Sequence, residues 1–93
     1  MTSDGLRTFI MLSKLKNFTR TAERMFVAQS TVTNRIFELE KEIGKKLFER
    51  RAGGVELTEE GSVFLNYAVR MTELEESFIQ EVNSSAKYKK TLK

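Results

Sequence analysis

The chain has 93 residues, of which 40% are hydrophobic and 31% charged, and a net charge of +3. This length accommodates one small folded domain. Cys and His are both absent, which removes disulfides, thiolate chemistry and the side chain used most often as general base and metal ligand. No apolar run approaches the ~20 residues of a membrane helix. We therefore expect a cytoplasmic protein that is not an enzyme and has no catalytic residues, metal or cofactor.

Charge is distributed unevenly along the chain. Residues 1–54 contain eleven Lys and Arg against six acidic residues, whereas residues 55–86 contain seven Glu against Arg70 alone. A basic front half joined to an acidic segment indicates two surfaces, the first of which suits a polyanion. Blocks of charge are also typical of ordinary solvated surfaces. The distribution is therefore compatible both with a polyanion-binding surface and with a surface that is only solvated.

The absence of Pro and of long strand-like alternation predicts a mostly helical chain. The first helix is predicted over about 4–14, where apolar residues recur at three- and four-residue spacing. The second helix is expected to begin with Thr19 as its N-cap and to end near Phe26. It is expected to bury Ala22 and Met25.

A third helix is predicted over 29–43. Its inward stripe consists of apolar residues spaced by four, three and four, namely Val32, Ile36, Leu39 and Ile43. Gly44 is expected to end this helix in the left-handed conformation. Two short β segments are then predicted, about 47–50 and 55–57, and the glycine pair Gly53-Gly54 between them indicates a tight hairpin.

A fourth helix is predicted to begin after Thr58 as its N-cap and to continue to about Asn83, roughly 37 Å in length. A helix this long must project beyond the small domain. Its apolar residues recur close to a heptad seam. We expect this seam to pair with a second copy of the chain through Phe64, Tyr67, Met71, Leu74, Phe78 and Val82. The alternative is a helix that folds back onto its own domain.

A helix, a tight turn, a second helix and a glycine-tipped hairpin follow one another in a winged helix-turn-helix. In that arrangement the helix after the turn enters the major groove of DNA. Its opening outward positions are all polar and none is acidic: Gln29, Ser30, Thr31, Thr33, Asn34 and Arg35. Gln and Asn offer the paired donor and acceptor that match adenine. Polar helix faces are usually only solvated, but this run favours DNA binding.

Several segments resemble the amino-terminal domain of LysR-type transcriptional regulators. They are Phe18–Met25, Val27–Ser30, Val32–Ile36, Leu39-Glu40, Gly44, Leu47–Arg50 and Leu57–Gly61. The resemblance runs without gaps from about Leu6 into the fourth helix, and its combination of motifs is far more specific than a generic helix-turn-helix signature. It implies a bacterial regulator that binds double-stranded DNA as a homodimer, with tetramers expected for a full-length protein.

The resemblance also implies roles for individual positions. The expected base readers in the major groove are Gln29, Ser30, Thr33 and Asn34. The expected phosphate or mixed contacts are Thr19, Thr31 and Arg35. Arg50 is expected to reach the minor groove or the backbone from the wing, with Arg51 beside it.

Three features depart from the family's usual pattern. Ser30 stands where Pro is frequent and Ala28 where a capping Ser is frequent, so the start of the third helix is expected to be less rigid. Asn34 replaces a common Arg, which exchanges a preference for guanine for one for adenine or shortens the reach. The wing tip at 52–54, followed by Glu56, lacks basic residues that are frequent there.

The expected organisation is a winged helix-turn-helix over 1–58, a dimerisation helix over 59–84 and a hinge or disordered tail over 85–93. Since family members also carry an effector-binding domain, we expect this chain to be the DNA-binding part of a longer regulator, without a small-molecule site. A small stand-alone winged-helix repressor is the alternative in the same class. A protein–protein dimerisation module would explain the fourth helix but not the polar opening of the third.

Overall fold

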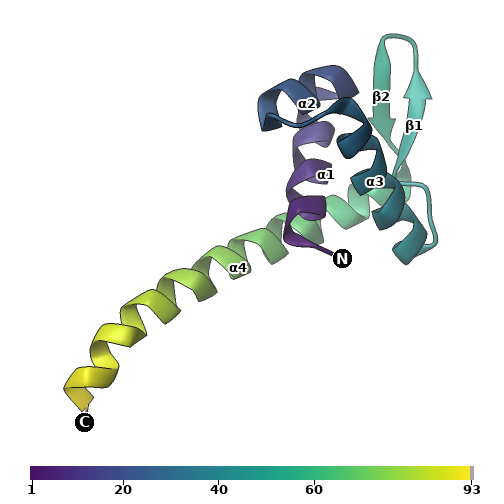
Figure 1. The fold of residues 1–93 in the computed structure, drawn as a ribbon. Helices are drawn as coiled ribbons and strands as arrows, with labels where there is room; N and C mark the ends of the chain where they lie inside the picture. The colour runs from purple at the N-terminus through teal and green to yellow at the C-terminus, as the bar shows by residue number, and fades with distance from the viewer. Residues whose placement is uncertain (93) are drawn as a thin grey trace.

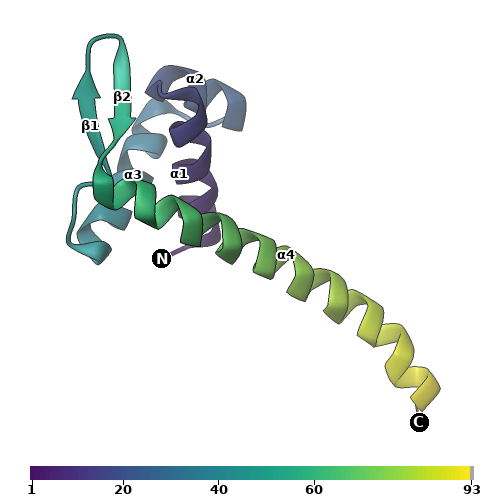
Figure 2. The ribbon, with the colours of Figure 1, turned by 180° about the vertical axis from the view of Figure 1, so that it is seen from behind.

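A computed structural model describes residues 1–92, with side chains described through Ser84, and Lys93 lies outside the described residues. The elements in chain order are α1 (Ser3–Leu15), α2 (Phe18–Met25), α3 (Gln29–Ile43), β1 (Phe48–Arg51), β2 (Gly54–Leu57) and α4 (Glu59–Leu92). The three short helices and the hairpin form a head from which α4 projects as an arm (Figures 1 and 2). The predicted mainly helical class with a two-stranded wing is confirmed.

Side-chain caps set the beginnings of α1 and α2. Thr2 Oγ1 accepts a hydrogen bond from the Gly5 N–H at 2.9 Å, and the Asn17 side chain accepts one from the Arg20 N–H at 2.8 Å. The prediction of Thr19 as the cap of the second helix is therefore wrong. Asn17 has the extended backbone that a cap needs, and α2 begins one residue before Thr19.

The core lies between α1, α3, the hairpin and the first turns of α4. Phe9 on α1 is fully buried, and its ring lies 5.2 Å from the ring of Phe48 on β1 and 4.9 Å from that of Phe64 on α4. Ala22 is buried as predicted, whereas Met25 is only half-buried. One aromatic cluster therefore joins the wing and the arm to the helical head.

The predicted bounds of the third helix are confirmed, as is its inward stripe. Val32, Ile36 and Leu39 are buried and Ile43 is half-buried. Gly44 follows with φ of 80°, and its N–H donates to the Glu40 carbonyl at 2.7 Å. Glycine adopts this left-handed conformation without the steric cost that a Cβ imposes.

The hairpin is a two-residue turn between antiparallel strands, with Phe48 opposite Leu57 and Arg51 opposite Gly54. The part of β2 next to the turn is attached to the end of α1, because the Val55 N–H donates to the Lys16 carbonyl at 3.1 Å. A Cβ at Gly54 would lie 2.2 Å from that same carbonyl oxygen. Glycine at this position therefore allows the wing to approach α1.

The predicted cap of the fourth helix is confirmed, since Thr58 Oγ1 accepts a hydrogen bond from the Gly61 N–H at 2.9 Å. The helix continues to Leu92, beyond the predicted end near Asn83. The division between a dimerisation helix over 59–84 and a tail over 85–93 stays a prediction. Despite this length, no helix among the described residues is apolar enough over a sufficient stretch to cross a bilayer.

Polar contacts attach α4 to α1 where the arm leaves the head. The Arg7 guanidinium lies 3.2 Å from the carboxylates of Glu75 and Glu76, and the Ser3 hydroxyl donates to Glu75 at 2.5 Å. The Ser3 hydrogen bond, with Arg7 beside it, holds the pKa of Glu75 below its usual value. Side chains over 77–84 are exposed, so the Glu75 region is the last firm attachment of the arm.

Replacing Gly61 by Ala is expected to destabilise the protein by about 1–3 kcal/mol, the usual cost of overpacking. A Cβ at this position would lie 2.1 Å from the Leu47 carbonyl oxygen, so α4 would have to move away from the hairpin. Urea denaturation measures the effect. Ser62→Ala, the same helix one residue along and exposed, serves as the control and should leave the free energy of unfolding almost unchanged. A Gly61→Ala variant as stable as the wild type would contradict this close approach.

Candidate nucleic-acid interface

The start of α3 and the tip of the hairpin lie at the end of the head away from α4, whereas the base of the hairpin leads into α4 (Figure 1). All four predicted base readers on α3 are exposed: Gln29, Ser30, Thr33 and Asn34. No acidic residue occurs in α3 before Glu38. This surface therefore combines hydrogen-bonding side chains with an absence of the carboxylates that phosphates would repel.

Hydrogen bonds restrict two of these side chains. The Thr19 hydroxyl on α2 donates to Gln29 Oε1 at 3.3 Å, which links the first turns of α2 and α3. The Thr33 hydroxyl donates to the Gln29 carbonyl one turn earlier, at 3.2 Å. Gln29 is thus at the centre of a small polar group whose geometry is partly set before any ligand arrives.

Thr31 and Arg35 are only half-buried, and the Arg35 side chain is turned towards α1. Its guanidinium donates to Thr8 Oγ1 at 3.2 Å and lies 3.8 Å from the Asp4 carboxylate. Thr8 is fully buried on α1. Arg35 therefore attaches α3 to α1, a role that the sequence analysis missed because the partners are separated by 27 positions.

The start of α3 has no side-chain cap. Ala28 has the extended backbone of an N-cap residue, with φ of −70° and ψ of 152°, but its methyl group accepts no hydrogen bond. That the start of α3 is less rigid for this reason stays a prediction. The first amides of α3 are left without a side-chain acceptor from the cap position.

The two wing arginines lie on β1, and both are exposed. Arg51 lies 3.4 Å from the Glu49 carboxylate two residues earlier, on the same side of the strand. Arg50 points the other way, and its guanidinium carbon lies over the Phe18 ring, 5.6 Å from the centroid. An acidic group therefore faces one wing cation and an aromatic ring faces the other.

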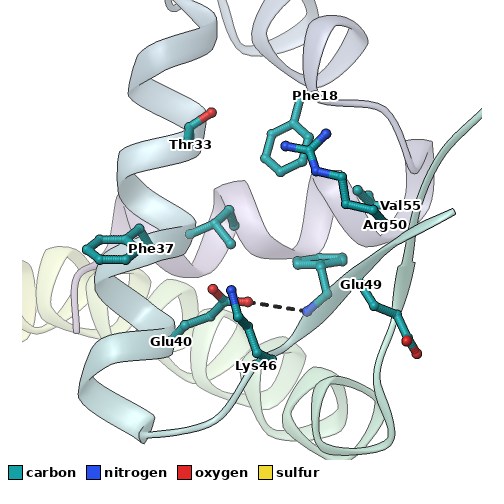
Figure 3. Close-up of a pocket in the computed structure, with 10 residues that line it drawn as sticks. Phe18, Thr33, Phe37, Glu40, Lys46, Glu49, Arg50 and Val55 are labelled. Atoms are coloured by element: carbon teal, nitrogen blue, oxygen red, sulfur yellow. Dashed lines mark hydrogen bonds between the residues drawn. The ribbon is translucent and has the colours of Figure 1, made fainter.

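Arg50 lines a hollow of about 190 Å³ between α3 and the wing (Figure 3). Phe18 lies beside Arg50, and Thr33 lies across the hollow on α3 (Figure 3). Glu40 also lines the hollow, and its carboxylate accepts hydrogen bonds from the Leu47 N–H at 2.9 Å and the Phe48 N–H at 3.3 Å. Glu40 thus attaches α3 to the start of β1 and sets where the wing begins.

The six residues of the predicted dimer seam fall into two groups. Phe64 and Met71 are half-buried and pack against the core of their own head. The other four are exposed, by 48% to 72%: Tyr67, Leu74, Phe78 and Val82. Ile79, beside the seam, is also half exposed. The structure therefore leaves Tyr67, Leu74, Phe78 and Val82 on an outward apolar face of α4, whereas Phe64 and Met71 pack against the head.

The described residues contain no group of three acidic side chains placed to hold a metal ion.

Comparison with known proteins places these features in a family. The model described as bacterial regulatory helix-turn-helix protein, lysR family, matches residues 3–62. The HTH-type transcriptional regulator CitR of Bacillus subtilis (strain 168) is 45% identical over 78 residues, which cover 84% of this chain and 27% of CitR. The uncharacterized regulator YwqM of the same organism is 42% identical over 88 residues, which cover 95% of this chain and 30% of YwqM. This chain therefore spans less than a third of the length of either relative.

Solved structures agree with the sequence relatives. Vibrio fischeri DarR in complex with DNA matches 95% of this chain and 30% of that chain, with a TM-score of 0.90 and 31% identity. The CbnR DBD–DNA complex matches 92% of this chain and 99% of that chain, with a TM-score of 0.88 and 32% identity. In the second comparison the match covers almost the whole of the CbnR DBD chain.

Replacing Ala28 by Ser is expected to stabilise the protein by about 1 kcal/mol, because a hydroxyl at this position can accept a hydrogen bond from an early amide of α3. Thermal unfolding measures the change. Ala52→Ser makes the same substitution at the exposed wing tip, where there is no helix to cap, and should leave the midpoint unchanged. If Ala28→Ser did not raise the midpoint, the early amides of α3 would already have acceptors.

Proposed function

We propose a function from one premise: the chain belongs to the lysR family of bacterial regulatory helix-turn-helix proteins. It is a DNA-binding domain of that family, and it reads specific sequences in double-stranded DNA as a homodimer. The observation that carries the proposal is the exposed, acid-free opening of α3 at the same end of the head as the wing. The DNA complexes of DarR and CbnR, whose folds match this chain, support it.

In the proposed complex, α3 lies in the major groove. The base readers are Gln29, Ser30, Thr33 and Asn34. The carboxamides of Gln29 and Asn34 each present a donor and an acceptor, the pair that matches the major-groove edge of adenine. Because Thr19 restrains Gln29, that carboxamide loses less conformational freedom when it binds a base.

Contacts to the sugar-phosphate backbone fix the position of α3 in the groove. We assign these to Thr19, Thr31 and Arg35. The attachment of Arg35 to Thr8 and Asp4 leaves this residue at the edge of the face, where a phosphate would compete with the Asp4 carboxylate. Arg50 and Arg51 place positive charge on the wing for the neighbouring minor groove or backbone.

The projecting part of α4 supplies the homodimer contact. Leu74 is 72% exposed and Phe78 is 64% exposed, and each large apolar side chain stabilises a complex by about 1.5–3 kcal/mol when fully buried. Tyr67 and Val82 extend this face along the helix. A second copy of the same helix offers a matching surface, which would hold two heads at a defined separation on DNA.

CitR and YwqM are both longer than the segment that matches this chain. Since the chain spans less than a third of the length of either, we assign tetramer formation and any small-molecule response to the remaining parts of such regulators. A regulator that acts on chromosomal DNA works in the cytoplasm, on the nucleoid, and no membrane partner is proposed. Catalysis has no place in this function.

Selection of bound duplexes from a random pool tests the proposal. The expected result is an enriched motif with two-fold symmetry, because two identical heads held by paired helices read two inverted half-sites. If no duplex were enriched at low ionic strength, where non-specific contacts are strongest, the chain would instead be a protein–protein dimerisation module.

Gln29→Ala is expected to weaken binding to the enriched duplex by about 1–3 kcal/mol while leaving binding to random duplex nearly unchanged. The cause is the loss of a paired hydrogen bond to a base edge, which carries the sequence information. Titration of both duplexes at one salt concentration measures the difference. Gln80→Ala, the same change at an exposed position on α4, should alter neither affinity. Equal losses on both duplexes would show that Gln29 contacts no base.

Leu74→Asp combined with Phe78→Asp is expected to give monomers, because two carboxylates would be placed in an apolar contact between helices. Analytical ultracentrifugation measures the mass. Asn66→Asp combined with Gln80→Asp adds the same charge at exposed polar positions of α4 and should remain dimeric. A Leu74/Phe78 variant with the mass of the wild type would show that the homodimer uses another surface.

A further inference from the structure

We propose that Phe18 is a positioning residue for DNA recognition. Its ring holds the Arg50 guanidinium in one place, on the wing side of the exposed face at the start of α3 (the reading face). The inference rests on the proposed DNA-binding function and adds a residue to it. Phe18 itself is not assigned a contact with a base or a phosphate. It acts through Arg50.

The geometry is that of a cation held over an aromatic face. The Arg50 guanidinium carbon lies 5.6 Å from the centroid of the Phe18 ring, within the distance at which the ring quadrupole attracts a cation. Phe18 is the first residue of α2 and packs against the core. The ring is therefore fixed by the head, whereas Arg50 is an exposed side chain on β1 that would otherwise sample many rotamers.

Two other cations of this region have a different environment. Arg51 lies 3.4 Å from the Glu49 carboxylate, and Lys16 lies 3.3 Å from the Glu56 carboxylate. Those ion pairs neutralise charge and would have to be broken before the cation met a phosphate. Within the described part of the chain, no carboxylate lies within 4.0 Å of Arg50 in an ion pair. A π face attracts the guanidinium without cancelling its charge, so Arg50 keeps its full charge for DNA.

The position of the pair relates the wing to the reading helix. Arg50 and Phe18 line the hollow whose other side carries Thr33, one of the predicted base readers (Figure 3). With the ring as its support, the guanidinium stays at a set distance from α3. A wing contact placed in advance loses less conformational entropy on binding than a freely rotating one.

Stepwise fluorination of the Phe18 ring in this chain tests the inference, because fluorine weakens the negative π face while changing the ring shape little. The affinity for the enriched duplex is expected to fall steadily along the series, by roughly two- to fivefold in all, the range of an exposed cation–π contact. The same series in an Arg50→Met background is expected to be flat. In an Arg51→Met background, the decline in affinity should persist, because the cation removed there pairs with Glu49 and not with the Phe18 ring.

A second measurement reads the contact without DNA. The side-chain protons of Arg50 should be shielded by the Phe18 ring current in NMR spectra, and Phe18→Leu should remove that shielding. Absent shielding, or an equal decline in the wild-type and Arg50→Met backgrounds, would overturn the positioning role alone. If the unmodified chain bound no duplex at all, both the proposed function and this inference would fall.

Discussion

The packing of Phe9 is the constraint on which the rest of this molecule depends. Its buried ring contacts Phe48 at the start of the wing and Phe64 on the first turns of α4, so a single aromatic cluster positions both elements against α1. Close backbone approaches at Gly54 and Gly61 complete the same arrangement. Because protein interiors are close-packed, α3, the wing and the first turns of α4 form one rigid unit.

Polar contacts also attach α3 to the neighbouring elements of this unit. Arg35 attaches α3 to Thr8 on α1, and Glu40 attaches α3 to the amides that open β1. Among the described residues no buried side-chain polar atom lacks a partner. The inner side of α3 is thus fully engaged, and its outer side carries only groups that solvent or a ligand can reach. A helix held in this way can present Gln29 and Asn34 to a groove without reorganising.

The apolar side chains of α4 lie in two different environments. Phe64 and Met71 pack against the head, while Tyr67, Leu74 and Phe78 are exposed. Heptad spacing alone indicated one continuous seam, because periodicity identifies which side chains share a face and not what that face contacts.

Features with local causes could be predicted from the sequence alone. The span of α3, its end at Gly44 and the cap at Thr58 follow from spacing and from residues adjacent to each helix end. The wrong cap predicted for α2 lies only two residues from the observed cap, Asn17. The exposed polar residues in the first turns of α3 could likewise be predicted, since their exposure follows from helical periodicity. The tertiary structure alone decided the partners of Arg35 and Arg50 and which two residues of the seam pack against the head. Those contacts join residues far apart in the chain, and no local propensity encodes which distant side chains the fold brings together.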